Sequence, residues 1–388
     1  MSHYKDSFSH SKPRFVESAV NVIDPLVDNR HFSHSSSVHP VVRFLSSQGS
    51  ASLGNTVIYQ LPTTGYVHSM AIANDFAQTG TADMIPYVGA ACISRIVLRA
   101  GSETLHDYDY VDALNYLLKN VGNEESITRI MEAAGGSACD TTSAAIPNLM
   151  AMIPTAFSAL LGCKPLILHK LSVRCELEVT YRTQAQCSLA TATGGAISNS
   201  QLVLWMSESG DDLRESHQKE AIVHKSIDFR TFKSTAISTG SETSLDLSGF
   251  PGLIKRLSVR CSLSSEIDSS TPINYFNNQV IDTVKTDVDG AEETVFQDAR
   301  QGELTSIIFN QGKAQSSTLG YTYTVPLSLH TTESKTTHKH NVGGLHSSKV
   351  NKFLLKVTHS LGANAEVGIT AIIAALFQYK NGQLKRLL

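Results

Sequence analysis

The sequence has few charged residues, few cysteines and only one tryptophan. Charged side chains make up 17% of the chain, against about 25% in average soluble domains. Hydrophobic residues reach 41%, so the chain can bury a core, and its polar surface must come largely from Ser, Thr, Asn and Gln. Such a surface suits broad contacts between copies of one protein. A length of 388 residues is enough for two domains of ordinary size.

The six cysteines form no CxxC pair, and several lie in apolar, strand-like runs. A long chain with so few cysteines does not have the disulfide framework of small secreted domains. We therefore expect buried thiols that pack as small hydrophobic side chains. The cysteines are Cys92, Cys139, Cys163, Cys175, Cys187 and Cys261.

Long, uninterrupted hydrophobic runs are also missing. The N-terminal residues include no apolar segment of the kind that marks a secretory signal. Residues 141–163 carry no charge and could suggest a membrane span, but Pro147 and Pro154 interrupt them and Pro165 follows. Because each proline would break an isolated helix in lipid, we expect a buried connecting segment here.

Motifs of enzymes and metal sites are absent or incomplete. The chain has no P-loop and no GxGxxG, and residues 135–139, GGSAC, lack the last glycine of a serine nucleophile motif. Residues 287–290, DVDG, resemble the start of a calcium loop, but Asp298 stands where the loop needs its final Glu. Four irregularly spaced histidines favour an exposed loop over a metal site. They are His330, His338, His340 and His346. We predict no catalytic residue, no cofactor and no metal.

The net charge of −3 gives no sign of a surface for nucleic acid. We therefore expect no specific nucleic-acid recognition. Lys380, Lys385 and Arg386 form a small basic end that could contact lipid headgroups or nucleic acid, although a solvated tail is the default interpretation.

Residues 1–40 differ from the rest of the chain. They hold five of the 15 histidines, a Ser35-Ser36-Ser37 cluster and few large apolar side chains in any period. This composition predicts a flexible arm that becomes ordered only against a partner.

From about residue 55 the pattern changes to the alternation of β-strands. Residues 171–179, LSVRCELEV, place apolar side chains at every odd position, which predicts a strand with one solvated face. Residues 366–376 are apolar on both faces, as in a central buried strand. A helix is predicted over 107–118 and a shorter one over 124–134. Other predicted strands cover residues 55–61, 93–99, 201–206, 257–263, 321–327 and 352–359.

Two short segments hint at an internal duplication. Residues 93–99, ISRIVLR, and 254–260, IKRLSVR, share a pattern 161 residues apart, roughly the length of one eight-stranded sandwich. The string LSVRC recurs at 171 and 257 in a conflicting register, which we interpret as coincidence.

Three segments of the first half follow one another in a distinctive order. Residues 85–112 pass from a glycine-containing approach into a strand, a hairpin, an aromatic and acidic stretch and a helix. Residues 153–179 join a proline and aromatic segment to a PLIL step and an alternating strand, and residues 202–206 form a last strand that leads to a connection over 215–225. In order and spacing these segments resemble the double jelly-roll major capsid proteins of tailless, often membrane-containing double-stranded DNA viruses.

The resemblance implies an all-β fold of two tandem eight-stranded jelly-roll sandwiches with a few short helices in loops. It divides the chain into an arm over 1–40, a first jelly roll over 41–225 and a second over 226–388. It implies homotrimers of pseudo-hexagonal outline that assemble into an icosahedral shell of a virion, with minor capsid or penton proteins as further partners. The arm would lie on the inner side, near neighbouring blocks or an internal lipid membrane. Its candidate assembly residues are Phe8, Phe15 and Val16.

Two other functions are compatible with an all-β chain. A carbohydrate- or receptor-binding sandwich, such as a viral spike or minor capsid protein, would need exposed aromatic side chains, and the single Trp205 lies in an apolar strand. A cupin-like enzyme would need histidines and a carboxylate close together on adjacent strands, and no such spacing occurs.

Overall fold

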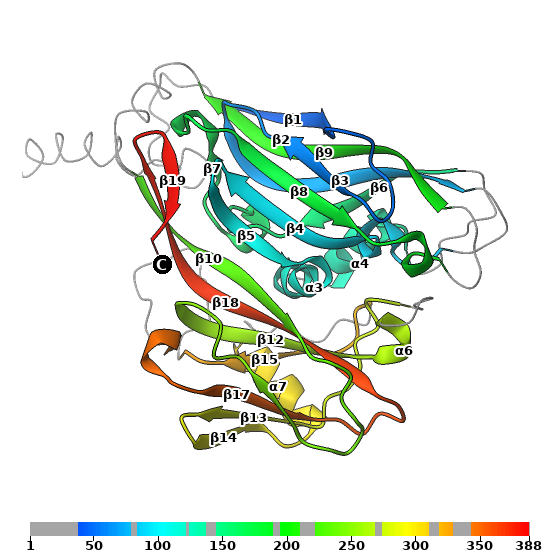
Figure 1. Cartoon of the computed structure of the whole chain (residues 1–388), viewed down its shortest axis with the longest axis vertical. Helices are drawn as coiled ribbons and strands as arrows, with labels where there is room; N and C mark the ends of the chain where they lie inside the picture. Colours follow the sequence, from blue (N-terminus) through cyan, green and yellow to red (C-terminus); the bar gives the residue numbers. More distant parts are fainter. Residues whose placement is uncertain are drawn as a thin grey trace, which may run out of the picture.

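A computed structural model of the chain describes residues 38–78, 84–121, 124–136, 145–188, 195–209, 222–267, 274–309, 318–328 and 343–387. These residues form two β-sandwiches, one above the other in Figure 1, whose long strands run in a similar direction.

The first sandwich has two antiparallel sheets. One sheet has the strand order β1-β9-β3-β6 with the short β7 paired to β3, and the other has the order β2-β8-β4-β5. Eight strands that alternate in this way between two sheets make a jelly roll. The strands are β1 (Val38–Ser46), β2 (Thr56–Gln60), β3 (Tyr66–Gln78), β4 (Ile93–Ala100), β5 (Glu103–Asp109), β6 (Ala145–Ile153), β7 (Leu166–Ile167), β8 (Cys175–Tyr181) and β9 (Gly195–Ser209).

The second sandwich repeats this topology. Its sheets have the orders β10-β18-β12-β15, with β16 paired to β12 and β19 to β18, and β11-β17-β13-β14. If the short strands β7, β16 and β19 are left out of the count, each sandwich has eight main strands. In both sandwiches, the first, eighth, third and sixth main strands share one sheet, in that order. The strands are β10 (Ile222–Lys233), β11 (Thr243–Asp246), β12 (Leu253–Leu263), β13 (Thr283–Val288), β14 (Ala291–Phe296), β15 (Thr322–Pro326), β16 (Leu345–His346), β17 (Phe353–Thr358), β18 (Ala365–Lys380) and β19 (Gln383–Arg386).

The main helices occupy the same connection in both sandwiches. α3 (Tyr110–Val121) and α4 (Glu124–Ala133) lie between β5 and β6, and α7 (Ala299–Phe309) lies between β14 and β15. Short helical turns occur elsewhere. They are α2 (Val88–Ala91), α6 (Ser264–Ile267), η2 (Ala159–Leu161), η3 (Leu168–Lys170), η4 (Gln184–Gln186) and η5 (Ser347–Lys349). The predicted all-β fold with two jelly rolls and a few short helices is confirmed.

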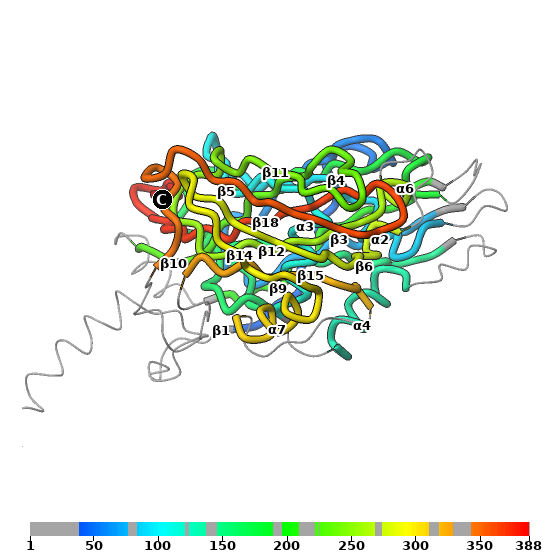
Figure 2. The backbone as a smooth tube through the Cα atoms, turned by 90° about the horizontal axis from the view of Figure 1, so that it is seen from below, coloured from blue at the N-terminus to red at the C-terminus, as the bar shows by residue number. Residues whose placement is uncertain are grey.

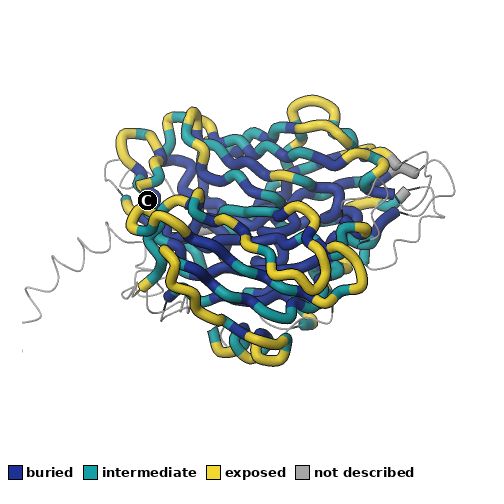
Figure 3. The backbone as a smooth tube through the Cα atoms, turned by 60° about the horizontal axis from the view of Figure 1, so that its bottom comes forward, coloured by how far each residue is buried: buried dark blue, intermediate teal, exposed yellow. Residues whose placement is uncertain are grey.

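Buried apolar side chains form two clusters. One fills the first sandwich and continues across the junction to Phe229 and Phe377 of the second, and the other fills the second sandwich. Figure 3 shows buried backbone along this junction as well as inside each sandwich. The central strand β18 faces both clusters, through Ile369 and Ile373 on one and Ile372 and Phe377 on the other, which explains why residues 366–376 are apolar on both faces.

Two predicted boundaries are wrong. The helix predicted from residue 107 begins at Tyr110, because residues 107–109 still pair with β4 as the end of β5. The strand predicted over 171–179 begins only at Cys175, after η3 and a bend. The helix predicted over 124–134 and the remaining predicted strands are confirmed. The predicted bounds agree within one residue for β2, β4, β15 and β17, whereas β9, β12 and β18 extend several residues beyond the predicted ranges.

The uncharged segment 141–163 is neither a helix nor only a connection. Its described part contains β6, an edge strand of the first sandwich, followed by the turn η2. No helix within the described residues is long and apolar enough to cross a membrane.

The predicted internal echo is wrong, and a different one is present. Residues 93–99 lie on β4, the fourth main strand of the first sandwich, whereas residues 254–260 lie on β12, the third main strand of the second. The true repeat joins a two-residue strand, a 3₁₀ turn and the seventh main strand: β7-η3-β8 and β16-η5-β17. In both, the short strand pairs with the third main strand, β3 or β12.

The chain passes from the first sandwich to the second between β9 and β10. The predicted division at residues 225 and 226 falls inside β10, and residues 38–40 of the predicted arm lie in β1.

Candidate assembly surfaces

A buried polar network joins the two sandwiches. Nδ1 of His106 on β5 lies 2.9 Å from Oδ1 of Asp228 on β10, and both side chains are fully buried. The backbone N–H of Ala156 donates to Nε2 of His106 at 3.0 Å, so Nδ1 carries the proton that is donated to Asp228. Arg230 and Arg386 form ion pairs with the other carboxylate oxygen of Asp228.

This network keeps a carboxylate ionised inside the junction. Burial raises the pKa of Asp228, but the hydrogen bond from His106 and the charges of Arg230 and Arg386 outweigh burial, and the resulting pKa lies below the usual value. Removal of one partner would leave an uncompensated buried charge. The network therefore favours one relative arrangement of the two sandwiches.

Helix α3 lies across the outer face of the sheet β10-β18-β12-β15. Asp112 and Arg260 form a buried ion pair with Nε and Oδ1 2.5 Å apart. Tyr116 accepts a hydrogen bond from Arg256 at 2.5 Å, and its ring centroid lies 5.5 Å from that of Phe229. A helix from the first sandwich thus contacts strands β10 and β12 of the second and covers the face between them.

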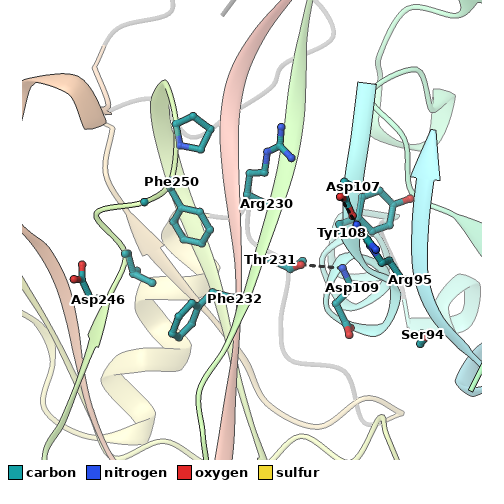
Figure 4. Close-up of a pocket in the computed structure, with 13 residues that line it drawn as sticks. Ser94, Arg95, Asp107, Tyr108, Asp109, Arg230, Thr231, Phe232, Asp246 and Phe250 are labelled. Carbon is teal, nitrogen blue, oxygen red and sulfur yellow. Dashed lines mark hydrogen bonds and ion pairs between the residues drawn. The ribbon is translucent and has the colours of Figure 1, made fainter. Parts of the chain in front are cut away.

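The ends of β5 and β10 add polar contacts at the same junction. The backbone N–H of Asp109 donates to Oγ1 of Thr231 at 2.8 Å, and Nζ of Lys233 lies 3.0 Å from Oδ2 of Asp109. Burial raises the pKa of Asp109, but Lys233 and other nearby cations lower it by more than burial raises it. The pKa therefore lies below its usual value, and the carboxyl is held ionised. Figure 4 shows Asp109 and Thr231 meeting between the two sandwiches.

A groove of about 670 Å³ runs beside these contacts, between β4 and β5 on one side and β10 and the β11 loop on the other. In its wall, Arg95 binds Asp107 through two hydrogen bonds of 2.7 and 2.5 Å. A paired guanidinium and carboxylate offer neither a free anion-binding group nor a general base. Within the described residues, no group of three or more His, Cys, Asp or Glu side chains could hold a metal ion.

In the part of the chain that the structure describes, large apolar side chains are exposed at only a few places. Val42 and Phe44 lie on β1, and Leu304 and Ile308 lie on α7. The remaining two described positions are Val223 and Leu387. The pairs on β1 and α7 were not predicted from the sequence. The alternation of side chains along β1 and the four-residue spacing in α7 could have indicated that each pair shares one face.

The predicted sites have mixed outcomes. Phe8, Phe15 and Val16 lie outside the described residues, as do His330, His338 and His340. The DVDG segment ends β13 and forms the turn to β14, where Asp289 and Gly290 have φ angles of 51° and 89°. The predicted burial of thiols is confirmed in the four fully buried cysteines among the described residues, whereas Cys163 is only half-buried. The fully buried ones are Cys92, Cys175, Cys187 and Cys261.

The fold is similar to those of solved viral capsid proteins. No protein-family model and no curated protein matches the sequence. Among solved structures, a chain of the PBCV-1 virus capsid is 12% identical with a TM-score of 0.70, and the alignment covers 92% of this chain and 98% of that one. The Faustovirus major capsid protein is 9% identical with a TM-score of 0.65, covering 90% and 92%. The mavirus major capsid protein is 8% identical with a TM-score of 0.56, covering 89% and 90%.

These alignments extend over nearly the whole of each chain. The likeness to the solved structures therefore includes both sandwiches, and is not limited to a single jelly roll. The protein has the double jelly-roll fold of these viral major capsid proteins.

Proposed function

We propose that this protein is a major capsid protein that forms homotrimers and, from them, the icosahedral shell of a virion. The observation that carries the proposal is the rigid pair of jelly rolls: two sandwiches of one topology, side by side and joined by buried ion pairs. The structural likeness to viral major capsid proteins over about nine-tenths of the chain supports the same function.

The geometry explains why three copies suit a shell. Each chain supplies two similar sandwiches whose strands run in a similar direction (Figures 1 and 2). Three such chains around a threefold axis place six sandwiches in a ring, which gives a block of nearly hexagonal outline. Blocks of this outline can tile a surface through many weak contacts, and the contacts then add up by avidity.

Residues 1–37 would supply part of the contact between blocks. Phe8, Phe15 and Val16 are the large apolar side chains that we assign to it. An inner membrane, if the virion has one, would lie against the same segment, and minor proteins would occupy the vertices.

Sedimentation and electron microscopy of the full-length protein test the proposal. We expect a particle of three times the chain mass that shows a pseudo-hexagonal outline in projection and forms sheets or shells at high protein concentration. A version without residues 1–37 should keep the trimer and lose the larger assemblies. A protein that stays monomeric up to the concentrations at which virion proteins assemble would contradict the proposal.

A further inference from the structure

Besides the contacts of β5 with β10, the junction between the sandwiches within one chain pairs a helix with a sheet face. The helix is α3, between the fifth and sixth strands of the first sandwich, and the face is the outer face of the second sandwich's sheet β10-β18-β12-β15. On β10, Ile227 and Phe229 form an apolar pair two residues apart and are 2% and 0% exposed. They are buried because the first sandwich covers this face.

The second sandwich carries its own helix in the same connection, and part of that helix is uncovered. One side of α7 packs on β15: the Thr324 N–H donates to Oγ of Ser306 at 2.9 Å, and Gly302 lies so close to the Tyr323 ring that a Cβ there would be 2.8 Å from it. On the other side, Leu304 and Ile308 are 59% and 71% exposed. These two side chains are four residues apart and share one helical face.

The first sandwich carries its own version of the receiving sheet, β1-β9-β3-β6. Its first strand also has an apolar pair two residues apart, Val42 and Phe44, but these are 49% and 63% exposed. Leu45 packs against the core of the first sandwich, so its neighbours in the strand point to the outer face. The residues opposite the pair on β9 are Trp205, which is half-buried, and Val203, which is buried.

Each half of the in-chain contact therefore has a counterpart that the described residues leave exposed. We propose that α7 of one copy docks on the outer face of β1-β9-β3-β6 of a second copy, with Leu304 and Ile308 against Val42 and Phe44. This inference rests on the proposed trimer and names the surfaces that form it. Around the ring, contacts within a chain would alternate with contacts between chains, each pairing one helix with one sheet face.

The chemistry of the two kinds of contact differs in a way that fits their roles. The in-chain contact contains buried ion pairs such as Asp112 with Arg260, which a covalently linked pair of sandwiches forms once on folding. The exposed surfaces present aliphatic and aromatic side chains, which associate without the desolvation of charges. The contact is head-to-tail, because the helix and the sheet face are different surfaces, and such contacts close into a ring only when the rotation between copies fits.

Two variants separate the two surfaces. Val42→Asp with Phe44→Asp places charges on the sheet face, and Leu304→Asp with Ile308→Asp places charges on the helix. Each should weaken trimerisation about a hundredfold or more, as expected when interface anchors are lost, so that each variant alone is monomeric in sedimentation velocity. Val223→Asp, at a position also 49% exposed but outside both surfaces, is the matched control and should remain a trimer.

The decisive measurement is a mixture of the two variants. The sheet-face variant retains an intact helix and the helix variant retains an intact sheet face, so an equimolar mixture should form a one-to-one heterodimer and nothing larger. The heterodimer also proves that both variants fold. Homodimers of either variant alone would overturn the head-to-tail pairing, as would two folded variants that stay monomeric when mixed.

The outcome for the wild-type protein separates this inference from the proposed function. A wild-type trimer whose variants are still trimers overturns the assigned surfaces and leaves the trimer standing. A wild-type monomer overturns both.

Discussion

Asp112 of the first sandwich and Arg260 of the second form an ion pair that is almost completely buried, with side-chain exposures of 1% and 3%. Burial opposes the charge of Arg260, but Asp112 and Asp109 outweigh it and raise the pKa of the guanidinium above its usual value. Arg260 also donates to Ser262 at 2.7 Å. The pair thus fixes α3 on the sheet of the second sandwich through a charged contact without access to water.

Breaking this pair from one side should destabilise the protein strongly. We expect Asp112→Ala to lower the free energy of unfolding by about 3–5 kcal/mol, because Arg260 is left as an uncompensated buried charge. The double variant Asp112→Leu with Arg260→Met should lose much less. Urea unfolding of both variants measures the difference, and equal losses in the single and double variants would show that the charge is not the cause.

The glycine at position 368 leaves room for the same ion pair. A Cβ at Gly368 would collide with Oδ1 of Asp112 and lie 2.9 Å from Nε of Arg260. Gly368→Ala should therefore displace the pair and reduce stability by about 1–3 kcal/mol. Gly249→Ala is the matched control, because a Cβ there meets nothing within 4 Å. Thermal unfolding of the two variants should differ clearly, and similar melting temperatures would contradict the role of Gly368.

His68 should make stability depend on pH in mildly acidic solution. Burial lowers the pKa of His68 from 6.5 to about 4, while Nε2 lies 2.9 Å from Oγ of Ser207. Between these two pH values the unfolded chain binds a proton that the folded chain does not, so stability falls as the pH drops from about 6.5 towards 4.

His68→Gln should remove this component of the pH dependence, about 1 kcal/mol once solvent screening of a partly exposed group is allowed for. Urea midpoints at pH 7 and pH 4.5 measure it. The same change at the exposed His39 serves as control, and equal slopes for wild type and His68→Gln would refute the assignment.

The buried cysteines should be chemically inert. Burial raises the pKa of Cys175, Cys187 and Cys261 to about 12 in each case, and alkylation requires the thiolate. In native protein at pH 8, iodoacetamide should modify the half-buried Cys163 well before Cys187. Mass spectrometry of peptides over time gives the two alkylation rates. Similar rates would contradict the prediction, because they would show that local opening of the first sandwich exposes Cys187 to the reagent.

Local patterns in the sequence predicted most strands because side-chain alternation in a strand depends on near neighbours only. The two-sided apolar pattern of residues 366–376 correctly indicated a central strand, although the reason, burial against both sandwiches, became visible only in the structure. The start of the helix at Tyr110 was misplaced because acidic residues before it suit both a helix N-terminus and the end of a strand such as β5, where Asp107 pairs with Arg95 and Asp109 with Lys233.

Helix α7 was missed for a different reason. Gly302 is its fourth residue and weakens any helical pattern, yet the glycine is what allows close packing against Tyr323. The internal repeat was misassigned because any two amphipathic strands look alike over seven residues. Only the strand order shows that β4 and β12 occupy different places in their sandwiches.

The sequence by itself determined that the chain is built of strands with a few helices, and its order of segments indicated two jelly rolls. The tertiary structure decided which apolar residues remain uncovered. Val42 and Phe44 repeat the spacing of Ile227 and Phe229, but one pair is exposed and the other buried. Period-two alternation specifies which side chains share a face of a strand, whereas the coverage of that face depends on residues distant in the sequence.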